Sequence, residues 1–285
     1  KSGTDTLIKL TDNKDNSGLY TITHPADNTL QIGANESITE YRYRGASPKN
    51  YVTFNNETWR IIGIFPTDDG TGKIENRIKI IKDQSIGEYK WDTSGSSNWA
   101  RPATLNTELN TTYLNSLDST SQSMIGNTKY YLGGTADYWS DGYVDTPLQF
   151  YSYERKIMNK PSISYFYSGN PNNWVGKIAL MYASDYGYAS ENCEGKRIYD
   201  TRSLLYDIRA CNDMNWLYNI KTDEWLLSQV STNKYYVFSI SSIGSIVTGG
   251  VTNRQYAVRP TLYLTSSVKI TGGSGTSSDP YTLGI

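Results

Sequence analysis

The clearest pattern in the chain is Trp225-Leu-Leu-Ser-Gln-Val-Ser-Thr-Asn-Lys-Tyr-Tyr-Val-Phe-Ser-Ile240, which leads on to Tyr256-Ala-Val-Arg-Pro-Thr-Leu-Tyr-Leu264. Short runs of β-branched and aromatic residues separated by turn residues are typical of β-strands. The pattern predicts a strand over residues 236–240, a turn and a second strand from residue 243, and a last strand over residues 258–264. It has none of the spacings of a catalytic motif, so it indicates a binding scaffold.

A hairpin and a further strand are predicted nearer the N-terminus. Residues 51–54 and 58–65 are rich in β-forming residues and flank Asn55 and Asn56, a pair typical of a tight hairpin turn. Residues 76–82 predict another strand after a turn at residues 68–72. Consecutive hairpins predict an antiparallel sheet with one face exposed to water.

The best helix candidate is residues 103–117, where Leu105, Leu109, Tyr113 and Leu117 recur every four residues and form one apolar stripe. Shorter helices are predicted at residues 119–125 and 200–206. Strands, then a helix, then long loops and again strands predict an α+β fold in one domain, with a twisted antiparallel sheet. We expect a lead-in segment or stalk junction over residues 1–38 and a single body over residues 39–285, with an aromatic, loop-rich insertion at about residues 130–173.

Composition limits the partners of the protein. The 285 residues carry a formal net charge of -1 and no basic stripe, so we expect no binding to nucleic acid. No run approaches the roughly 18 apolar residues of a membrane span. Tyrosine is abundant, with 25 residues against 5 Phe, and its amphipathic ring suits recognition surfaces as well as cores.

The two cysteines, Cys193 and Cys211, predict a disulfide bond. The 17 residues between them form a loop of a length whose closure stabilises a fold by roughly 3 kcal/mol in the chain-entropy description. A disulfide together with a polar, weakly charged composition favours an extracellular protein. The alternative is a pair of unrelated buried thiols.

Catalytic and metal-binding patterns are weak. His24 is the only histidine and lies in the polar lead-in, so a His-based triad is not expected. The acidic pairs Asp68/Asp69 and Asp223/Glu224 lie in turn-like sequence and are predicted to be solvated. We therefore expect no enzyme activity, no cofactor and no metal site.

Two charged residues are expected to have structural roles. Asp185 lies between Ser184 and Tyr186 at the end of a predicted strand and should cap a turn. Arg259 lies among apolar residues of the last predicted strand. Because burying a lone guanidinium is costly, this side chain should have a partner. Contact with a ligand is the alternative for Arg259.

The aromatic stretch at residues 130–173 is the best candidate for a binding surface. Tyrosine and tryptophan on loops anchor ligands and protein partners. We expect ligand contacts from Tyr138, Trp139, Tyr143 and Tyr153. The alternative is that these rings cover the core beneath a long insertion.

The segments that carry a family resemblance include Thr39-Glu-Tyr-Arg-Tyr43, Asn50-Tyr-Val-Thr-Phe-Asn-Asn-Glu-Thr-Trp-Arg-Ile-Ile-Gly63, Trp174-Val-Gly-Lys-Ile-Ala-Leu-Met-Tyr182 and Gly275-Thr-Ser-Ser-Asp-Pro-Tyr-Thr-Leu283. They resemble a set of uncharacterised, pilin-like surface proteins of gut Firmicutes. The resemblance covers most of residues 39–285 and assigns no activity. It implies a place at the bacterial cell surface, with an anchoring segment upstream of Lys1.

More distantly, the C-terminal pattern is similar to C-type-lectin-like domains of the formylglycine-generating-enzyme and retroelement-variable-protein type. In those domains a Trp-rich strand, a turn and an Arg-containing strand close the fold, which implies a C-type-lectin-like scaffold here. The chain lacks the calcium and sugar signature of true C-type lectins and the paired reactive cysteines of the enzymes. Neither calcium-dependent sugar binding nor that oxidation is therefore implied.

The loop aromatics and the resemblance together predict a binding function. We expect an adhesin-like or pilin-associated protein that recognises a host glycan or a host surface protein. One alternative is a structural pilus subunit that contacts only other pilus subunits. A further alternative is an enzyme that acts on surface polysaccharide.

Overall fold

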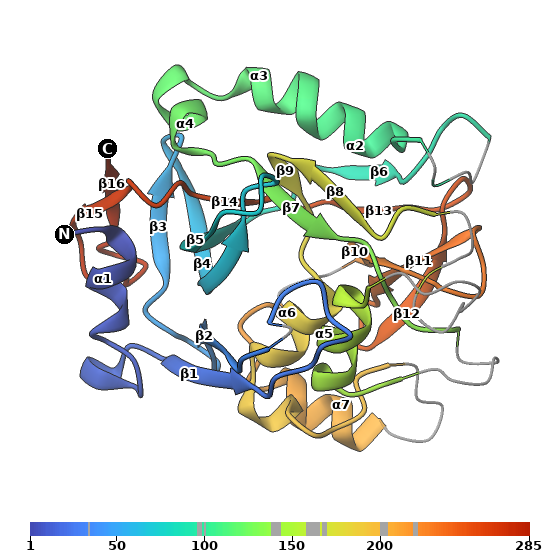
Figure 1. Ribbon diagram of the computed structural model, residues 1–285, viewed down its shortest axis with the longest axis horizontal. Helices are drawn as coiled ribbons and strands as arrows, with labels where there is room; N and C mark the ends of the chain where they lie inside the picture. Colours follow the sequence, from blue (N-terminus) through green and yellow to red (C-terminus); the bar gives the residue numbers. More distant parts are fainter. Residues whose placement is uncertain are drawn as a thin grey trace.

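Two large β-sheets, two two-stranded ribbons and a set of short helices make up the described part of the protein, shown here by a computed structural model (Figure 1). The structure describes residues 1–33, 35–95, 99, 101–137, 144–157, 166, 170–199, 205–218 and 222–285. Within these residues, strands and short helices are mixed in one chain, so the predicted α+β class is confirmed.

The larger sheet has seven strands, all in antiparallel pairs. Its order is β1-β2-β4-β5-β14-β9, and β3 pairs separately with β4. The strands are β1 (Leu19–His24), β2 (Ile38–Tyr43), β3 (Tyr51–Phe54), β4 (Glu57–Asp68), β5 (Ile74–Lys82), β9 (Ile178–Ala179) and β14 (Thr261–Tyr263). Through β1, the first 38 residues supply a strand to this sheet, paired along its whole length with β2.

The second sheet has five strands in the order β12-β11-β10-β13-β6. Its pairs are antiparallel except for β10 with β13, which run parallel. The strands are β6 (Glu88–Lys90), β10 (Glu224–Gln229), β11 (Tyr236–Ile240), β12 (Ile246–Gly250) and β13 (Gln255–Ala257). Two ribbons complete the strands, β7 (Thr128–Tyr131) with β8 (Asn173–Gly176) and β15 (Lys269–Gly272) with β16 (Thr282–Gly284).

The helices lie on opposite sides of the strands (Figure 1). On one side are α2 (Thr104–Glu108), η2 (Leu109–Tyr113), α3 (Leu114–Ser116) and α4 (Ser119–Met124). On the other are α5 (Pro147–Arg155), α6 (Ala183–Tyr188), η3 (Glu191–Cys193) and α7 (Leu205–Asn212), while α1 (Gly3–Ile8) and η1 (Lys14–Asn16) lie near the N-terminus. None of these helices is long and apolar enough to cross a membrane.

The predicted hairpin forms because its turn residues adopt a left-handed backbone. Asn55 and Asn56 have φ of 53° and 56°, and they connect β3 to β4. Two consecutive residues with positive φ match the twist of the flanking strands, and Asn tolerates that conformation. Beyond the turn, β4 alternates little and is buried over most of its length, because it lies inside the sheet between its neighbours.

The predicted helix at residues 103–117 is confirmed, with an irregularity that the pattern did not indicate. Residues 104–116 run through α2, η2 and α3, and η2 is a turn of π-helix. Leu105, Leu109 and Leu117 are buried as expected. The predicted helix at residues 119–125 is confirmed as α4. The one predicted at residues 200–206 overlaps α7 only at its end, and residues 200–204 lie outside the described residues.

The single strand predicted over residues 258–264 is wrong in its first half. The chain leaves the five-stranded sheet after β13 and enters the seven-stranded sheet at β14. Only Val258, Arg259 and Pro260 separate the two strands. Pro260 has no N–H for a sheet ladder, which suits a position between sheets. Residues 258–260 therefore connect the two sheets directly.

Candidate binding pocket

An apolar pocket of about 220 Å³ lies among the described residues. It lies where β9, at the edge of the larger sheet, and β6, at the edge of the smaller sheet, are both contacted by the helix that runs through α2 and η2. Leu227 of β10 and Ala179 of β9 contribute to its lining from the two sheets. We call this the tryptophan pocket, because three tryptophans line it: Trp91, Trp99 and Trp174.

Trp91 and Trp99 form one wall. Their rings stack at a centroid distance of 5.6 Å and an interplanar angle of 28°. Trp91 is buried and also meets the edge of Trp225 at 5.8 Å, so the core holds it in place. Trp99 is only half-buried. The wall therefore has a fixed inner ring and an outer ring that reaches the solvent.

Trp174 of β8 contributes a second aromatic surface. Its ring stacks on Tyr130 of the paired strand β7, with centroids 5.6 Å apart. A Cβ atom at Gly176 would lie 1.9 Å from the Trp174 ring, so a larger residue cannot occupy that position without moving the ring. Cross-strand stacking and the missing side chain at Gly176 together fix the orientation of Trp174.

The helix wall is anchored by Asn110 in the π-helical turn. Its Nδ2 donates to the carbonyl oxygen of Ile178 at 2.9 Å, and its Oδ1 accepts the Ile178 N–H at 3.0 Å. These bonds satisfy the backbone of the edge strand β9. Leu109 and Leu105 of the same helix line the pocket. Single π-turns often occur at functional sites, where they re-aim side chains.

Asp92 and Arg101 give the pocket a charged pair. Arg101 Nη2 donates to Asp92 Oδ2 at 2.6 Å, while the Thr104 hydroxyl and the Ser94 N–H donate to Oδ1 at 2.9 and 3.0 Å. Burial of Asp92 opposes its ionisation, but these hydrogen bonds and the Arg101 charge outweigh burial and lower the pKa of the carboxyl. The pair is therefore charged near neutral pH. Asn106 and Asn173 add amide groups to the lining.

Of the four residues predicted from the sequence to contact a ligand, the structure describes only Tyr153. Tyr138, Trp139 and Tyr143 lie outside the described residues. Tyr153 is on α5, half-buried, and does not line the tryptophan pocket. Trp91 and Trp99 are close in the sequence, whereas Trp174 meets them only in the folded chain.

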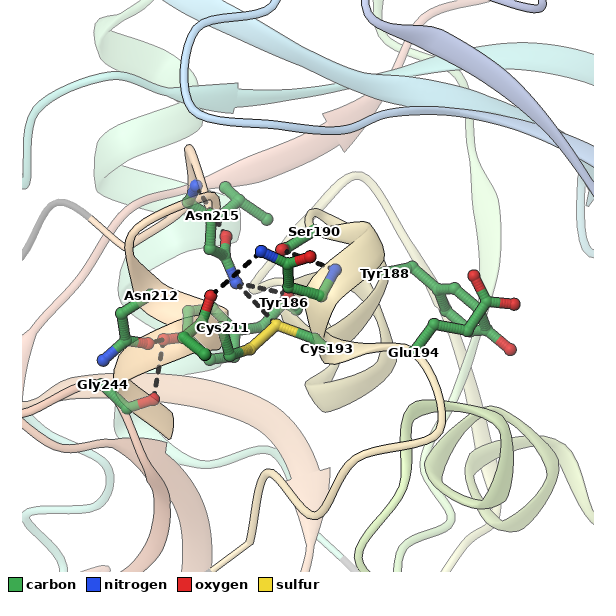
Figure 2. The surroundings of a disulfide bond; sticks show 12 residues. Tyr186, Tyr188, Ser190, Cys193, Glu194, Cys211, Asn212, Asn215 and Gly244 are labelled. Atoms are coloured by element: carbon green, nitrogen blue, oxygen red, sulfur yellow. Dashed lines mark hydrogen bonds between the residues drawn. A yellow bond between two sulfur atoms is a disulfide. The ribbon is translucent and has the colours of Figure 1, made fainter. Parts of the chain in front are cut away.

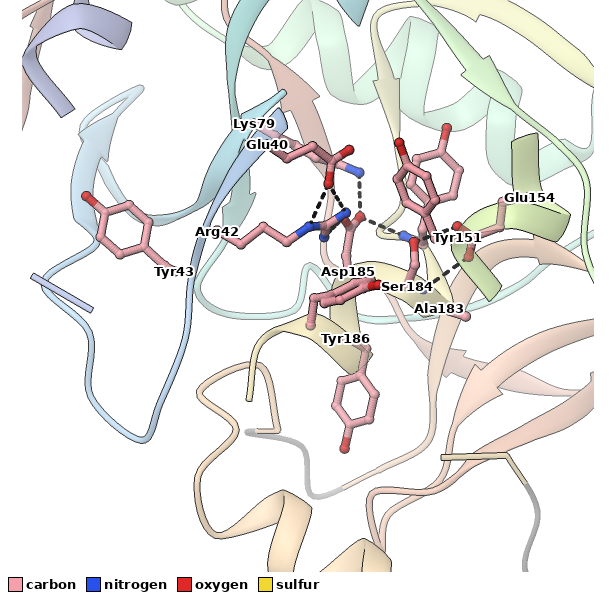
Figure 3. Close-up of polar contacts among 12 residues, drawn as sticks. Glu40, Arg42, Tyr43, Lys79, Tyr151, Glu154, Ala183, Ser184, Asp185 and Tyr186 are labelled. Atoms are coloured by element: carbon pink, nitrogen blue, oxygen red, sulfur yellow. Dashed lines mark hydrogen bonds and ion pairs between the residues drawn. The ribbon is translucent and has the colours of Figure 1, made fainter. Parts of the chain in front are cut away.

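Apart from the tryptophan pocket, a cluster of buried charged residues lies between the larger sheet and the helices α5 and α6 (Figure 3). It comprises Glu40, Arg42, Lys79, Glu154, Arg155 and Asp185, all buried. Arg42 lies 2.9 Å from Glu40 and 3.0 Å from Asp185. Arg155 lies 2.9 Å from Glu154. The Ser184 and Ser228 hydroxyls donate to Glu154 at 2.5 and 3.0 Å.

His24 belongs to the border of this cluster. Its Nε2 lies 3.1 Å from Glu40 Oε2, and its ring stacks on Tyr151 at 3.6 Å. Asp185 has the predicted capping role, because its Oδ2 accepts the Tyr182 N–H at 2.9 Å, at the start of α6. Its ion pairs with Arg42 and Lys79 could not be read from the sequence. Among the described residues, no group of acidic, His and Cys side chains could hold a metal ion.

Arg259 has the structural partner that was predicted. Its Nε and Nη2 donate to the two carboxylate oxygens of Glu224 at 2.8 and 3.0 Å, and Nη2 also donates to the Leu217 carbonyl at 2.9 Å. The prediction that Glu224 is solvated is wrong. Glu224 is the first residue of β10 and is buried. It pairs with Ala257 at the end of β13, and Arg259 follows two residues later, close enough to neutralise the carboxylate.

The predicted disulfide is confirmed between Cys193 of η3 and Cys211 of α7, whose Cα atoms are 4.8 Å apart (Figure 2). Both cysteines are buried. Asn215 donates to the Tyr186 carbonyl oxygen at 2.9 Å, and the Tyr186 hydroxyl donates to the Gly244 carbonyl oxygen at 2.7 Å. The disulfide links α7 to η3, and these bonds link α6 to the segment after α7 and to the turn between β11 and β12.

Comparison with known proteins adds no assignment. No protein-family model, no curated protein and no solved structure matches the chain.

Proposed function

We propose that the chain is an extracellular binding domain of a bacterial surface protein, and that its tryptophan pocket receives one aromatic side chain of a host protein. The observation that carries this proposal is the convergence of Trp91, Trp99 and Trp174 around one pocket of about 220 Å³. Pockets for drug-sized ligands measure roughly 300–1,000 Å³. The smaller volume suits a single ring at the end of a longer ligand.

The lining favours an aromatic side chain over a sugar ring. Leucine, isoleucine, valine and alanine side chains form most of the surface beside the tryptophans. A sugar would lose water from its hydroxyls against these apolar side chains, which is costly, and only a few polar side chains of the lining could offer hydrogen bonds in return. An aromatic ring instead buries apolar area and gains favourable ring contacts. Asp92 and Arg101, paired with each other, are the charged residues of the lining.

The place of the protein is part of the proposal. The Cys193–Cys211 disulfide supports an oxidising compartment, as expected outside the cell. The resemblance to pilin-like surface proteins supports the bacterial surface, with an anchor upstream of Lys1. The more distant resemblance of the C-terminal pattern to C-type-lectin-like domains supports a C-type-lectin-like scaffold for this α+β architecture.

The test is binding of the labelled protein to two arrays, one of peptides from host surface proteins and one of host glycans. We expect saturable binding to peptides that contain Trp, Tyr or Phe. Replacing Trp99→Ala should weaken it by at least about 2 kcal/mol, roughly 30-fold in Kd, because anchor contacts in a pocket dominate binding energy. The matched control is Tyr235→Ala, an aromatic ring that is 56% exposed and does not line the pocket.

Three results would overturn the proposal. Binding that survives Trp99→Ala unchanged would move the site away from the pocket. Equal losses in Trp99→Ala and Tyr235→Ala would point to a general effect on the fold. Binding to glycans alone, lost on Trp99→Ala, would keep the pocket but replace its occupant with a sugar.

A further inference from the structure

Lys79 and Asp185 form a pair that is unusual for its complete burial. Lys79 Nζ lies 2.5 Å from Asp185 Oδ2, and the two side chains are 0% and 1% exposed (Figure 3). Lysine is almost never fully buried, because its charge is strongly hydrated. Lys79 is in the middle of β5 and Asp185 is in the first turn of α6, 106 positions further along the chain. The pair therefore connects two distant elements in a dry environment.

The Lys79 side chain is buried among aromatic rings. Its Nζ lies 4.3 Å from the Tyr182 ring centre and 5.1 Å from that of Tyr263. Burial lowers the pKa of Lys79, although Asp185 acts in the opposite direction. A neutral amine is a nucleophile, whereas an ammonium group is not. The site thus holds a potential nucleophile in contact with a carboxyl group.

Two donors besides Lys79 fix the position of the Asp185 carboxyl group. Arg42 Nη1 donates to Oδ1 at 3.0 Å, and the Tyr182 N–H donates to Oδ2 at 2.9 Å. A fixed cation at Oδ1 stabilises the negative charge that develops there when a nucleophile adds to Cγ. Oδ2, the oxygen in contact with Lys79, is then the one positioned to leave.

We propose that Lys79 and Asp185 condense to an intramolecular amide, an isopeptide bond between β5 and α6. A proton passes from the Lys79 ammonium to Asp185 Oδ2 across their contact, which leaves an amine and a carboxylic acid. The amine lone pair adds to Cγ, so that the Nζ–Cγ bond forms and Oδ1 carries the transient charge beside Arg42. The Cγ–Oδ2 bond then breaks, and Oδ2 leaves as water with the transferred proton and a second proton from Nζ. No oxidant, reductant or other reactant is consumed.

The charge balance of the cluster supports this reaction. Before it, Arg42, Lys79 and Arg155 are balanced by Glu40, Glu154 and Asp185. After it, two arginines are balanced by two glutamates, and Arg42 still has Glu40 at 2.9 Å. The amide keeps an oxygen for the Arg42 donor, and it removes two buried charges that are costly to hold without water. The cluster is therefore neutral both with and without the bond.

The mass of the intact, full-length chain tests the proposal after reduction of the disulfide and denaturation. We expect the wild-type mass to be one water molecule below the mass of the sequence. Proteolysis should yield a branched peptide that contains both Lys79 and Asp185. Lys79→Arg keeps the positive charge but has no amine to condense, so it should have its full sequence mass.

A second variant separates condensation from other losses of water. Asp185→Asn can form the same amide with release of ammonia instead of water, so its product should have the wild-type linked mass. Dehydration at another aspartate would persist in Lys79→Arg and would give no branched peptide. A folded wild-type chain with its full sequence mass overturns the proposal and leaves Lys79 and Asp185 as an ion pair.

Discussion

The Arg259–Glu224 pair gives the sharpest prediction for stability. Arg259 and Glu224 are 5% and 1% exposed, and the guanidinium makes two bonds to the carboxylate and one to a backbone carbonyl. Removing one partner of a buried ion pair typically costs about 3–5 kcal/mol, because the other charge remains buried without compensation. We expect Arg259→Met to lower the free energy of unfolding by that amount.

The stability lost in Arg259→Met should increase as the pH rises. Burial already raises the pKa of Glu224 above its usual value in spite of Arg259. Without Arg259 the pKa of Glu224 rises further, so the folded variant binds a proton more tightly than the unfolded chain does. Its stability is then greatest below the unfolded glutamate pKa of roughly 4.3 and is lost as pH rises through the folded pKa. The difference in free energy of unfolding between wild type and Arg259→Met should therefore be smaller at pH 5 than at pH 8.

Urea denaturation followed by circular dichroism measures both effects. The matched control is the double variant Arg259→Met/Glu224→Leu, since replacing both members of a buried pair by apolar residues is often neutral. It should recover most of the lost stability and show no added pH dependence. The reasoning is refuted if Arg259→Met costs less than about 1 kcal/mol, or if the double variant is less stable than the single one.

Three further outcomes are expected. Cys193→Ser/Cys211→Ser should lower stability by roughly 3 kcal/mol, seen as a lower urea midpoint, and an unchanged midpoint would contradict a structural role for the disulfide. Burial opposes ionisation of Glu40, but Arg42 and His24 outweigh it and lower its pKa. The ionised Glu40 should therefore stabilise the fold above roughly pH 4.3, and this stabilisation should be lost on acidification. A Glu40→Gln variant should lose less free energy of unfolding than wild type between pH 7 and pH 2. Asn110→Ala leaves the N–H and C=O of Ile178 without their side-chain partner, so it should cost about 1–3 kcal/mol in thermal or urea unfolding, whereas the exposed change Thr111→Ala should cost little.

Local signals in the sequence predicted the local parts of the fold. The hairpin at Asn55 and Asn56 was predictable because its turn depends on two adjacent residues. The stripe through Leu105, Leu109 and Leu117 likewise identified its helix. The disulfide needed only two cysteines at a suitable spacing. By contrast, the π-turn at Asn110 depends on bonds to β9, which no pattern in residues 103–117 contains.

The site residues depended on contacts between distant segments. Trp91, Trp99 and Trp174 line one pocket only after β6, α2 and β8 are assembled. Lys79 stands in an alternating strand and resembles a solvent-facing residue, yet Asp185 neutralises it from 106 positions away. Glu224 looked like part of a solvated turn for the same reason, because its partner Arg259 lies on another segment. Asp185 was predicted correctly only in its local role as a cap.

The central claim is that the tryptophan pocket binds an aromatic ring, and nuclear magnetic resonance of the tryptophan side chains tests it most directly. Isotope-labelled protein would be titrated with N-acetyl-tryptophanamide as a minimal ring probe. We predict saturable shifts of the indole N–H signals of Trp99 and Trp174, which line the pocket, and little change at Trp59 and Trp216, which do not. Absence of any saturable shift, or shifts confined to tryptophans outside the pocket, would contradict the account.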